Sequence, residues 1–111
     1  MNIQELNTTY EGIRTVGCVF RNTKYAEGHE RTYTYLVPPE VGILKKGDLA
    51  IVEKDGVYSI VTITRIDDQS QVDPNATYRY KWLVSVTSTK HYADIVAAED
   101  KSIHGSVQSR L

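Results

Sequence analysis

The side chains best suited to acid–base, nucleophilic or metal chemistry are few and widely spaced. The only cysteine is Cys18, and no histidine lies at a metal-ligand spacing from it or from a second histidine. Cys18 stands in an apolar segment without a thiolate-stabilising neighbour, so we expect a buried thiol rather than a nucleophile. The sequence therefore predicts no catalytic residues, no metal site and no cofactor, and we expect a protein that is not an enzyme. The histidines, which we expect to be solvated, are His29, His91 and His104.

Three aspartates in one polar stretch could bind a cation. Asp67, Asp68 and Asp73 lack the regular ligand spacing and the glycine of a calcium loop. The stretch is therefore expected to be a solvated connection that ends at Asp73-Pro74.

Aromatic and basic residues alternate in TYRYKWLVSVTS, residues 77–88. A period of two predicts a half-buried antiparallel strand, with the aromatic rings on the core face and Trp82 mostly buried. In the alternative interpretation, Tyr78 and Tyr80 stack on bases of single-stranded DNA while Arg79 and Lys81 bind phosphates. Strict alternation counts against this alternative, because it sends the cations to the face opposite the rings.

Two adjacent lysines, Lys45 and Lys46, precede Gly47-Asp48. A phosphate-binding loop would need more glycine and a following helix, so the pair is expected to lie in a solvated turn. In the nucleic-acid alternative, both lysines are auxiliary phosphate contacts.

Composition limits the kind of protein. The 111 residues fit one domain, residues 1–111, and the 13 basic and 14 acidic residues leave a formal charge of -1. This charge gives no general attraction to nucleic acid or to an anionic membrane. A single cysteine and the lack of a long apolar run predict a protein of a reducing cytoplasm that does not enter a membrane.

Four strands are expected before the aromatic segment, at residues 13–20, 31–37, 49–54 and 57–66, because Val, Ile, Thr and Tyr are frequent there. Residues 22–30 are expected to form a loop, and Pro38-Pro39 must end the second strand. Asp55-Gly56 is a strong signal for a two-residue hairpin.

A helix of three or four turns is expected after Ser88-Thr89, ending near Gly105. Residues 1–11 and 106–111 show no pattern and are expected to be loosely ordered tails. The predicted fold is mainly β: a small antiparallel barrel or strongly bent sheet of about five strands, with the C-terminal helix closing one side.

Part of the sequence resembles a known family. The strand end Tyr33-x-Tyr35-x-Val37-Pro38, the turn Leu44-x-x-Gly47-Asp48 and the apolar strand pair that follows resemble the N-terminal 3′-DNA-end-binding domain of the primosomal helicase PriA. From about Gly12 to Ala98 the chain is also similar to small uncharacterised proteins of tailed bacteriophages. The first resemblance implies a small β-barrel that binds a DNA end, and the second implies a viral accessory protein.

We therefore expect a non-enzymatic binding module, encoded by a phage and cytoplasmic in the bacterial host. It would act on a host or phage protein by surface complementarity. The alternative is a sequence-independent binder of single-stranded DNA or DNA ends. The residues of that alternative are Lys45, Lys46, Tyr78, Arg79, Tyr80 and Lys81.

Overall fold

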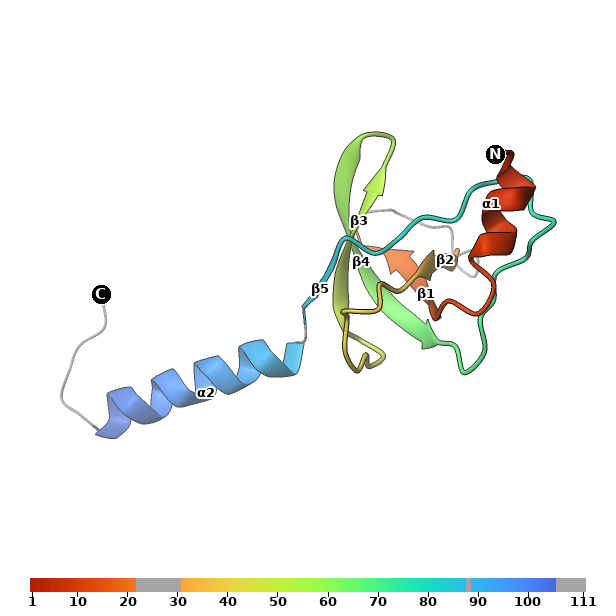
Figure 1. The fold of residues 1–111 in the computed structure, drawn as a ribbon. Coiled ribbons are helices and arrows are strands. Elements are labelled where there is room, and N and C mark those ends of the chain that lie inside the picture. The colour runs from red at the N-terminus through yellow and green to blue at the C-terminus, as the bar shows by residue number, and fades with distance from the viewer. Residues whose placement is uncertain (22–30, 88, 106–111) are drawn as a thin grey trace.

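The computed structural model describes residues 1–21, 31–87 and 89–105, so the predicted loop at 22–30 and tail at 106–111 lie outside the described residues. Two helices and five strands are present in this part of the chain (Figure 1). In chain order they are α1 (Ile3–Thr9), β1 (Thr15–Phe20), β2 (Tyr33–Leu36), β3 (Leu49–Lys54), β4 (Val57–Ile66), β5 (Ser85–Thr87) and α2 (Thr89–Gly105).

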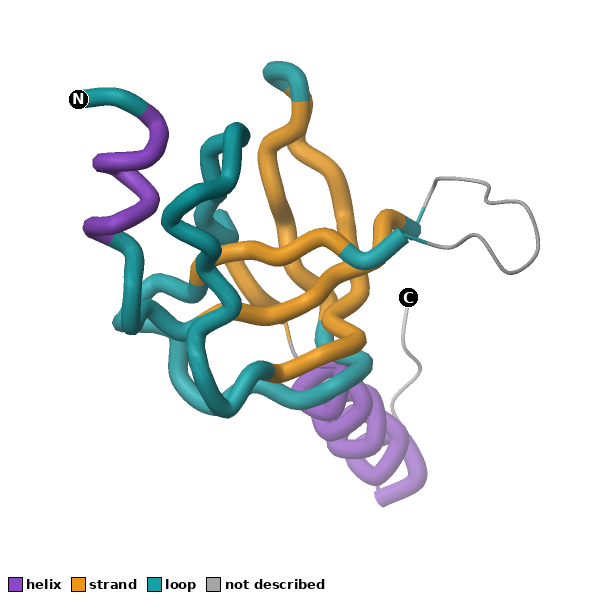
Figure 2. Tube along the Cα trace, turned by 90° about the vertical axis from the view of Figure 1, so that its right-hand side faces the viewer, coloured by secondary structure: helices purple, strands orange, loops and turns teal. Residues whose placement is uncertain are grey.

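The five strands form one antiparallel sheet in the order β2-β1-β4-β3-β5. The prediction of a mainly β fold with about five strands is confirmed. Figure 2 shows that the sheet is strongly bent, with the β3–β4 hairpin running across the direction of the other strands. One isolated bridge, between Leu36 of β2 and Trp82, links the two ends of the sheet. Because this bridge is not part of a continuous ladder, the sheet is not closed into a barrel.

The β3–β4 hairpin is the one that the sequence predicts. Asp55 and Gly56 form its two-residue turn, with φ angles of 52° and 80°. Both central residues of a type I′ turn need positive φ, which Gly and Asp adopt more readily than other residues. The local sequence therefore sets the register in which Lys54 pairs with Val57.

The main core lies on the concave side of the bent sheet. Buried residues alternate along β3 and along the middle of β4, with Ala50 and Val52 in β3 and Val61 and Ile63 in β4, as the period-two pattern predicts. Cys18 and Val52 are fully buried there. The cluster comprises Val16, Cys18, Phe20, Tyr35, Val37, Ala50, Val52, Val61, Ile63 and Leu83.

A second, smaller core lies on the other face of β2. Leu36, Ala76 and Tyr80 are buried there, with Tyr10 and Trp82 packed against them. Helix α1 borders this cluster. The sequence showed no pattern for α1, which begins where the Asn2 side chain accepts a hydrogen bond from the Glu5 backbone N–H.

Helix α2 ends near Gly105, as the sequence predicts, but it begins at Thr89 and is longer than the expected three or four turns. Contrary to the prediction, it does not close one side of the sheet. In Figure 1 it extends away from the strands. Tyr92 and Ile95 remain 68% and 45% exposed. Few of its residues are large and apolar, so the helix offers only a narrow stripe for packing. Neither described helix is both long and apolar enough to cross a membrane.

The prediction of a regular strand over residues 77–88 is wrong for most of its length. Only Ser85–Thr87 forms a strand, and Ser88 lies outside the described residues. Tyr80 and Leu83 are buried, whereas Tyr78 and Val84 are 61% and 53% exposed.

The cause is the backbone pairing of this segment. The Leu83 N–H donates to Leu36 O, and the next N–H, of Val84, donates to Ile51 O. These bonds to two different strands place Leu83 over the main core. Trp82, predicted to be mostly buried, is half-buried and contacts Tyr10 edge-on at a ring-centroid distance of 5.7 Å.

Gly17 gives a test of the packing between β1 and its neighbours. A Cβ at this position would lie 2.7 Å from Thr32 Cγ2 and 3.0 Å from Arg65 Cβ. We expect Gly17→Ala to lower the free energy of unfolding by about 1–3 kcal/mol, because the neighbours must move apart. Gly42→Ala, which meets no atom within 4 Å, is the matched control. Equal urea midpoints for the two variants would contradict this account.

Candidate binding groove

A groove of about 580 Å³ lies at the gap between β2 and the end of β3. The segment before β5 contributes a further wall. The groove therefore lies where the bent sheet is left open. Its lining residues are Phe20, Arg31, Thr32, Tyr33, Thr34, Tyr35, Glu53, Lys54, Tyr78, Arg79, Tyr80 and Lys81.

Cations dominate the charge of this groove. Arg31, Lys54, Arg79 and Lys81 line it against a single carboxylate, Glu53. Lys81 Nζ lies 2.9 Å from Glu53 Oε2, so these two charges compensate each other. Among the described residues no ion pair involves the other three cations. Counted over the described residues alone, the groove therefore has an excess of positive charge in a chain whose formal charge is -1.

Most of the aromatic rings in the groove are already in contact with other protein groups. Lys54 Nζ lies 4.7 Å from the ring centroid of Phe20 and 5.8 Å from that of Tyr33. Tyr35 and Tyr80 are buried. Tyr78 is the groove ring with a large exposed surface, and it leans on Tyr80 at a centroid distance of 5.3 Å. The groove thus offers one ring for stacking rather than a row of rings.

Helix α1 holds the wall that carries Tyr78. Its buried Asn7 side chain donates hydrogen bonds to the backbone oxygens of Ala76 and Tyr78, at 3.4 and 3.1 Å. These contacts join residues about seventy positions apart in the sequence. Nothing in the spacing of apolar residues near the N-terminus indicated this contact.

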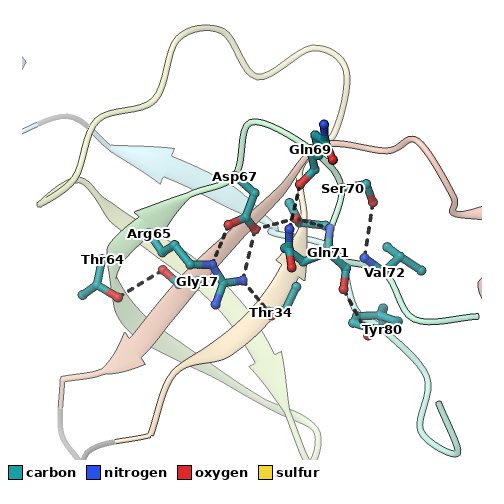
Figure 3. A network of polar contacts seen from close by, with 11 residues as sticks. Gly17, Thr34, Thr64, Arg65, Asp67, Gln69, Ser70, Gln71, Val72 and Tyr80 are labelled. Carbon is teal, nitrogen blue, oxygen red and sulfur yellow. Dashed lines mark hydrogen bonds and ion pairs between the residues drawn. The ribbon is translucent and has the colours of Figure 1, made fainter.

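A polar network holds β2 and Tyr80 in place (Figure 3). Arg65 donates to both carboxylate oxygens of Asp67 and, through Nη2, to Thr34 Oγ1 at 2.9 Å. Asp67 also accepts from Thr15 Oγ1, which in turn accepts from the Gln71 N–H at 3.0 Å. The Tyr80 hydroxyl donates to Gln71 O at 3.4 Å. The network therefore connects the β1–β2 pair to the groove.

The pKa values of two carboxylates are lowered, one in the polar network and one in the groove. Burial opposes ionisation of Asp67, but the bonds from Arg65 and Thr15 outweigh it and lower the pKa of Asp67 below its usual range. The hydrogen bond from Lys81 lowers the pKa of Glu53. Asp67 was expected to be a solvated loop residue, and its role in this network is a correction to that prediction.

The structure brings together four of the six residues of the nucleic-acid alternative. Tyr78, Arg79, Tyr80 and Lys81 line one groove, because the irregular path of their segment removes the strict alternation that the sequence predicted.

Lys45 and Lys46 are exposed in a turn at the start of β3, whereas the groove lies at the end of that strand. About 20 Å of extended chain separates the two places. The sequence reasoning missed Arg31, Lys54 and Thr34, which come from elements distant in the chain.

Other groups that could do chemistry are separated or buried. No three His, Cys, Asp or Glu side chains within the described residues come together as a metal ion would need. His29 lies outside the described residues, as do the side chains of His91 and His104. Cys18 is fully buried, as predicted, and burial raises the pKa of its thiol to about 12.

Comparison of the chain with protein-family models, curated proteins and solved structures gives no match. The groove must therefore be interpreted from its own geometry.

Cys18 should not react with a thiol reagent such as Ellman's reagent at pH 8 while the protein is folded, because it is buried and protonated. Unfolding in urea should expose one reactive thiol. The unfolded thiol ionises near pH 8.5, whereas the folded thiol keeps its proton to about pH 12. The stability contributed by the buried neutral thiol should therefore fall as pH rises through this window. Rapid labelling of the native protein would contradict this prediction.

Proposed function

We propose that the chain is a non-enzymatic binding module whose groove takes an extended acidic segment of a partner protein. The observation that carries the proposal is the charge of the groove. Arg31, Lys54 and Arg79 face a common hollow without an ion-pair partner among the described residues. Carboxylate side chains are the protein groups that complement such a surface.

The groove suits an extended segment better than a folded surface. It is bordered by strand β2 on one side and by the end of β3 on the other. A hollow of about 580 Å³ has room for a few residues in extended form rather than for a helix, whose diameter is about 10 Å. An origin in a bacteriophage and action on a host or phage protein in the cytoplasm remain part of this proposal, on the strength of the sequence resemblance.

The proposal predicts that a displayed library of random linear peptides, panned against the full chain, yields sequences rich in Asp and Glu. The affinity of one enriched peptide is then measured by fluorescence anisotropy at physiological salt. We expect Arg31→Gln and Arg79→Gln together to weaken its binding roughly five- to tenfold, because two of the cations that line the groove are removed.

Lys45→Gln with Lys46→Gln is the matched control, because it removes the same charge outside the groove. This control should bind like the parent. A library that gives no acidic sequences would refute the proposal, as would an equal loss of binding in the control.

Single-stranded DNA is a second candidate ligand, because exposed Tyr78 lies beside Arg79 and Lys81 in the groove. One exposed ring with adjacent cations can hold one base and its neighbouring phosphates. The other aromatic rings of the groove are buried or contact a lysine, so single-stranded DNA is a weaker candidate ligand than an acidic peptide.

This second candidate predicts that a ten-nucleotide oligo(dT) binds with an affinity that falls steeply with added salt. Tyr78→Ala should then cost about 1–3 kcal/mol of binding free energy, the range for loss of one stacked base. Tyr58→Ala, which removes a tyrosine that is 70% exposed and outside the groove, should have no effect. Affinity that does not change with salt would rule out this candidate.

A further inference from the structure

The backbone of β2 has an unpaired edge in the groove. The Val37 N–H donates to Arg14 O, so in this strand the odd-numbered residues pair with β1. The even-numbered residues face the other way. Leu36 shows this directly, because its N–H donates to Lys81 O and its O accepts from the Leu83 N–H, both at 2.9 Å.

Thr34 lies two residues before Leu36, so its N–H and C=O point to the same side. No backbone hydrogen bond to Thr34 from that side is found among the described residues. Thr34 also lines the groove. Its peptide groups are therefore presented to a ligand.

The end of β3 faces the groove in the same manner. Asp48 O accepts from the Ile63 N–H, so the even-numbered residues of β3 pair with β4. Ile51 O accepts from the Val84 N–H on the opposite side. β5 pairs with Leu49, Ala50 and Ile51, so the backbone of Glu53 lies beyond the end of β5. Lys81 Nζ donates a hydrogen bond to Glu53 O at 3.4 Å, so only the N–H of Glu53 has no hydrogen-bond partner on that side among the described residues.

We infer that the acidic segment binds as an added β-strand along the edge of β2 at Thr34, and so occupies the gap between β2 and β3. This inference rests on the proposed function and names its mode of recognition. An unpaired strand edge is a template for an extended chain, and main-chain bonds supply affinity that does not depend on side chains. The cations of the groove then select carboxylates on the ligand.

Strand addition has a consequence that charge attraction alone lacks. Successive peptide N–H groups of a strand point in opposite directions, so only every second ligand amide pairs with β2. Loss of binding should therefore alternate with a period of two when single ligand amides are methylated. A flexible acidic segment held by charge alone gives no such period.

The test uses the full chain and an acidic peptide enriched from the library. Thr34→Pro removes the edge N–H, and a proline is tolerated in an edge strand where that N–H faces away from the ladder. Thr34→Ala is the matched control, because both variants lose the bond to Arg65 while Thr34→Ala keeps the N–H. We expect the affinity of Thr34→Pro for the peptide to be at least roughly fivefold lower than that of Thr34→Ala. This is the effect of losing one hydrogen bond and of crowding by the proline ring.

An N-methyl scan of the peptide against the parent protein gives the second readout, which holds even if Thr34→Pro fails to fold. Alternating sensitivity supports the strand, and uniform sensitivity overturns it. Equal affinities of the two Thr34 variants overturn strand addition while leaving the proposed function intact. If oligo(dT) displaces the peptide and Thr34→Pro does not change peptide affinity, strand addition is overturned in favour of nucleic-acid binding. A library without acidic sequences overturns both proposals.

Discussion

The groove depends on a single place where the two ends of the sheet are tied together. Leu36 of β2 makes two backbone hydrogen bonds with the segment at Lys81–Leu83, and the bridge does not extend to Thr34. A continuous ladder would bury this edge. If the bridge were absent, β2 could separate from β3. Because the bridge is isolated, the sheet stays bent around its core and keeps an opening at one end.

Contacts between distant parts of the chain hold that opening in shape. Asn7 fixes the backbone at Ala76 and Tyr78, and the Arg65–Asp67 pair reaches Thr34 on one side and, through Thr15 and Gln71, Tyr80 on the other. Buried polar groups with partners are costly to disrupt, because loss of one partner leaves the other desolvated. These contacts tie both the β2 edge and the segment that carries Tyr78 and Tyr80 to distant parts of the fold.

The sequence predicts most of the sheet and only part of the groove. The β3–β4 hairpin follows from Asp55-Gly56, because the turn type is encoded in two adjacent residues. The C-terminal end of α2 follows from local patterns as well. Helix α1 and the path of residues 77–84 do not, since both depend on bonds to residues far away in the chain. The sequence indicates Tyr78, Arg79, Tyr80 and Lys81 as site residues on the expectation of a regular strand, which the structure does not contain at these positions.

The net charge of the chain describes this groove poorly. Charges act over about 8 Å at physiological salt, so a bound ligand responds to the groove cations and to their close neighbours rather than to the whole molecule. Two acidic residues lie next to residues that line the groove: Asp55 follows Lys54 at the hairpin turn, and the Asp73 backbone N–H donates to the hydroxyl oxygen of Tyr80. A long polyanion that leaves the groove would pass these carboxylates and be repelled. A partner segment that is acidic only within the groove would not be repelled in this way, so the local arrangement of charge supports our proposal of a peptide ligand over a nucleic acid.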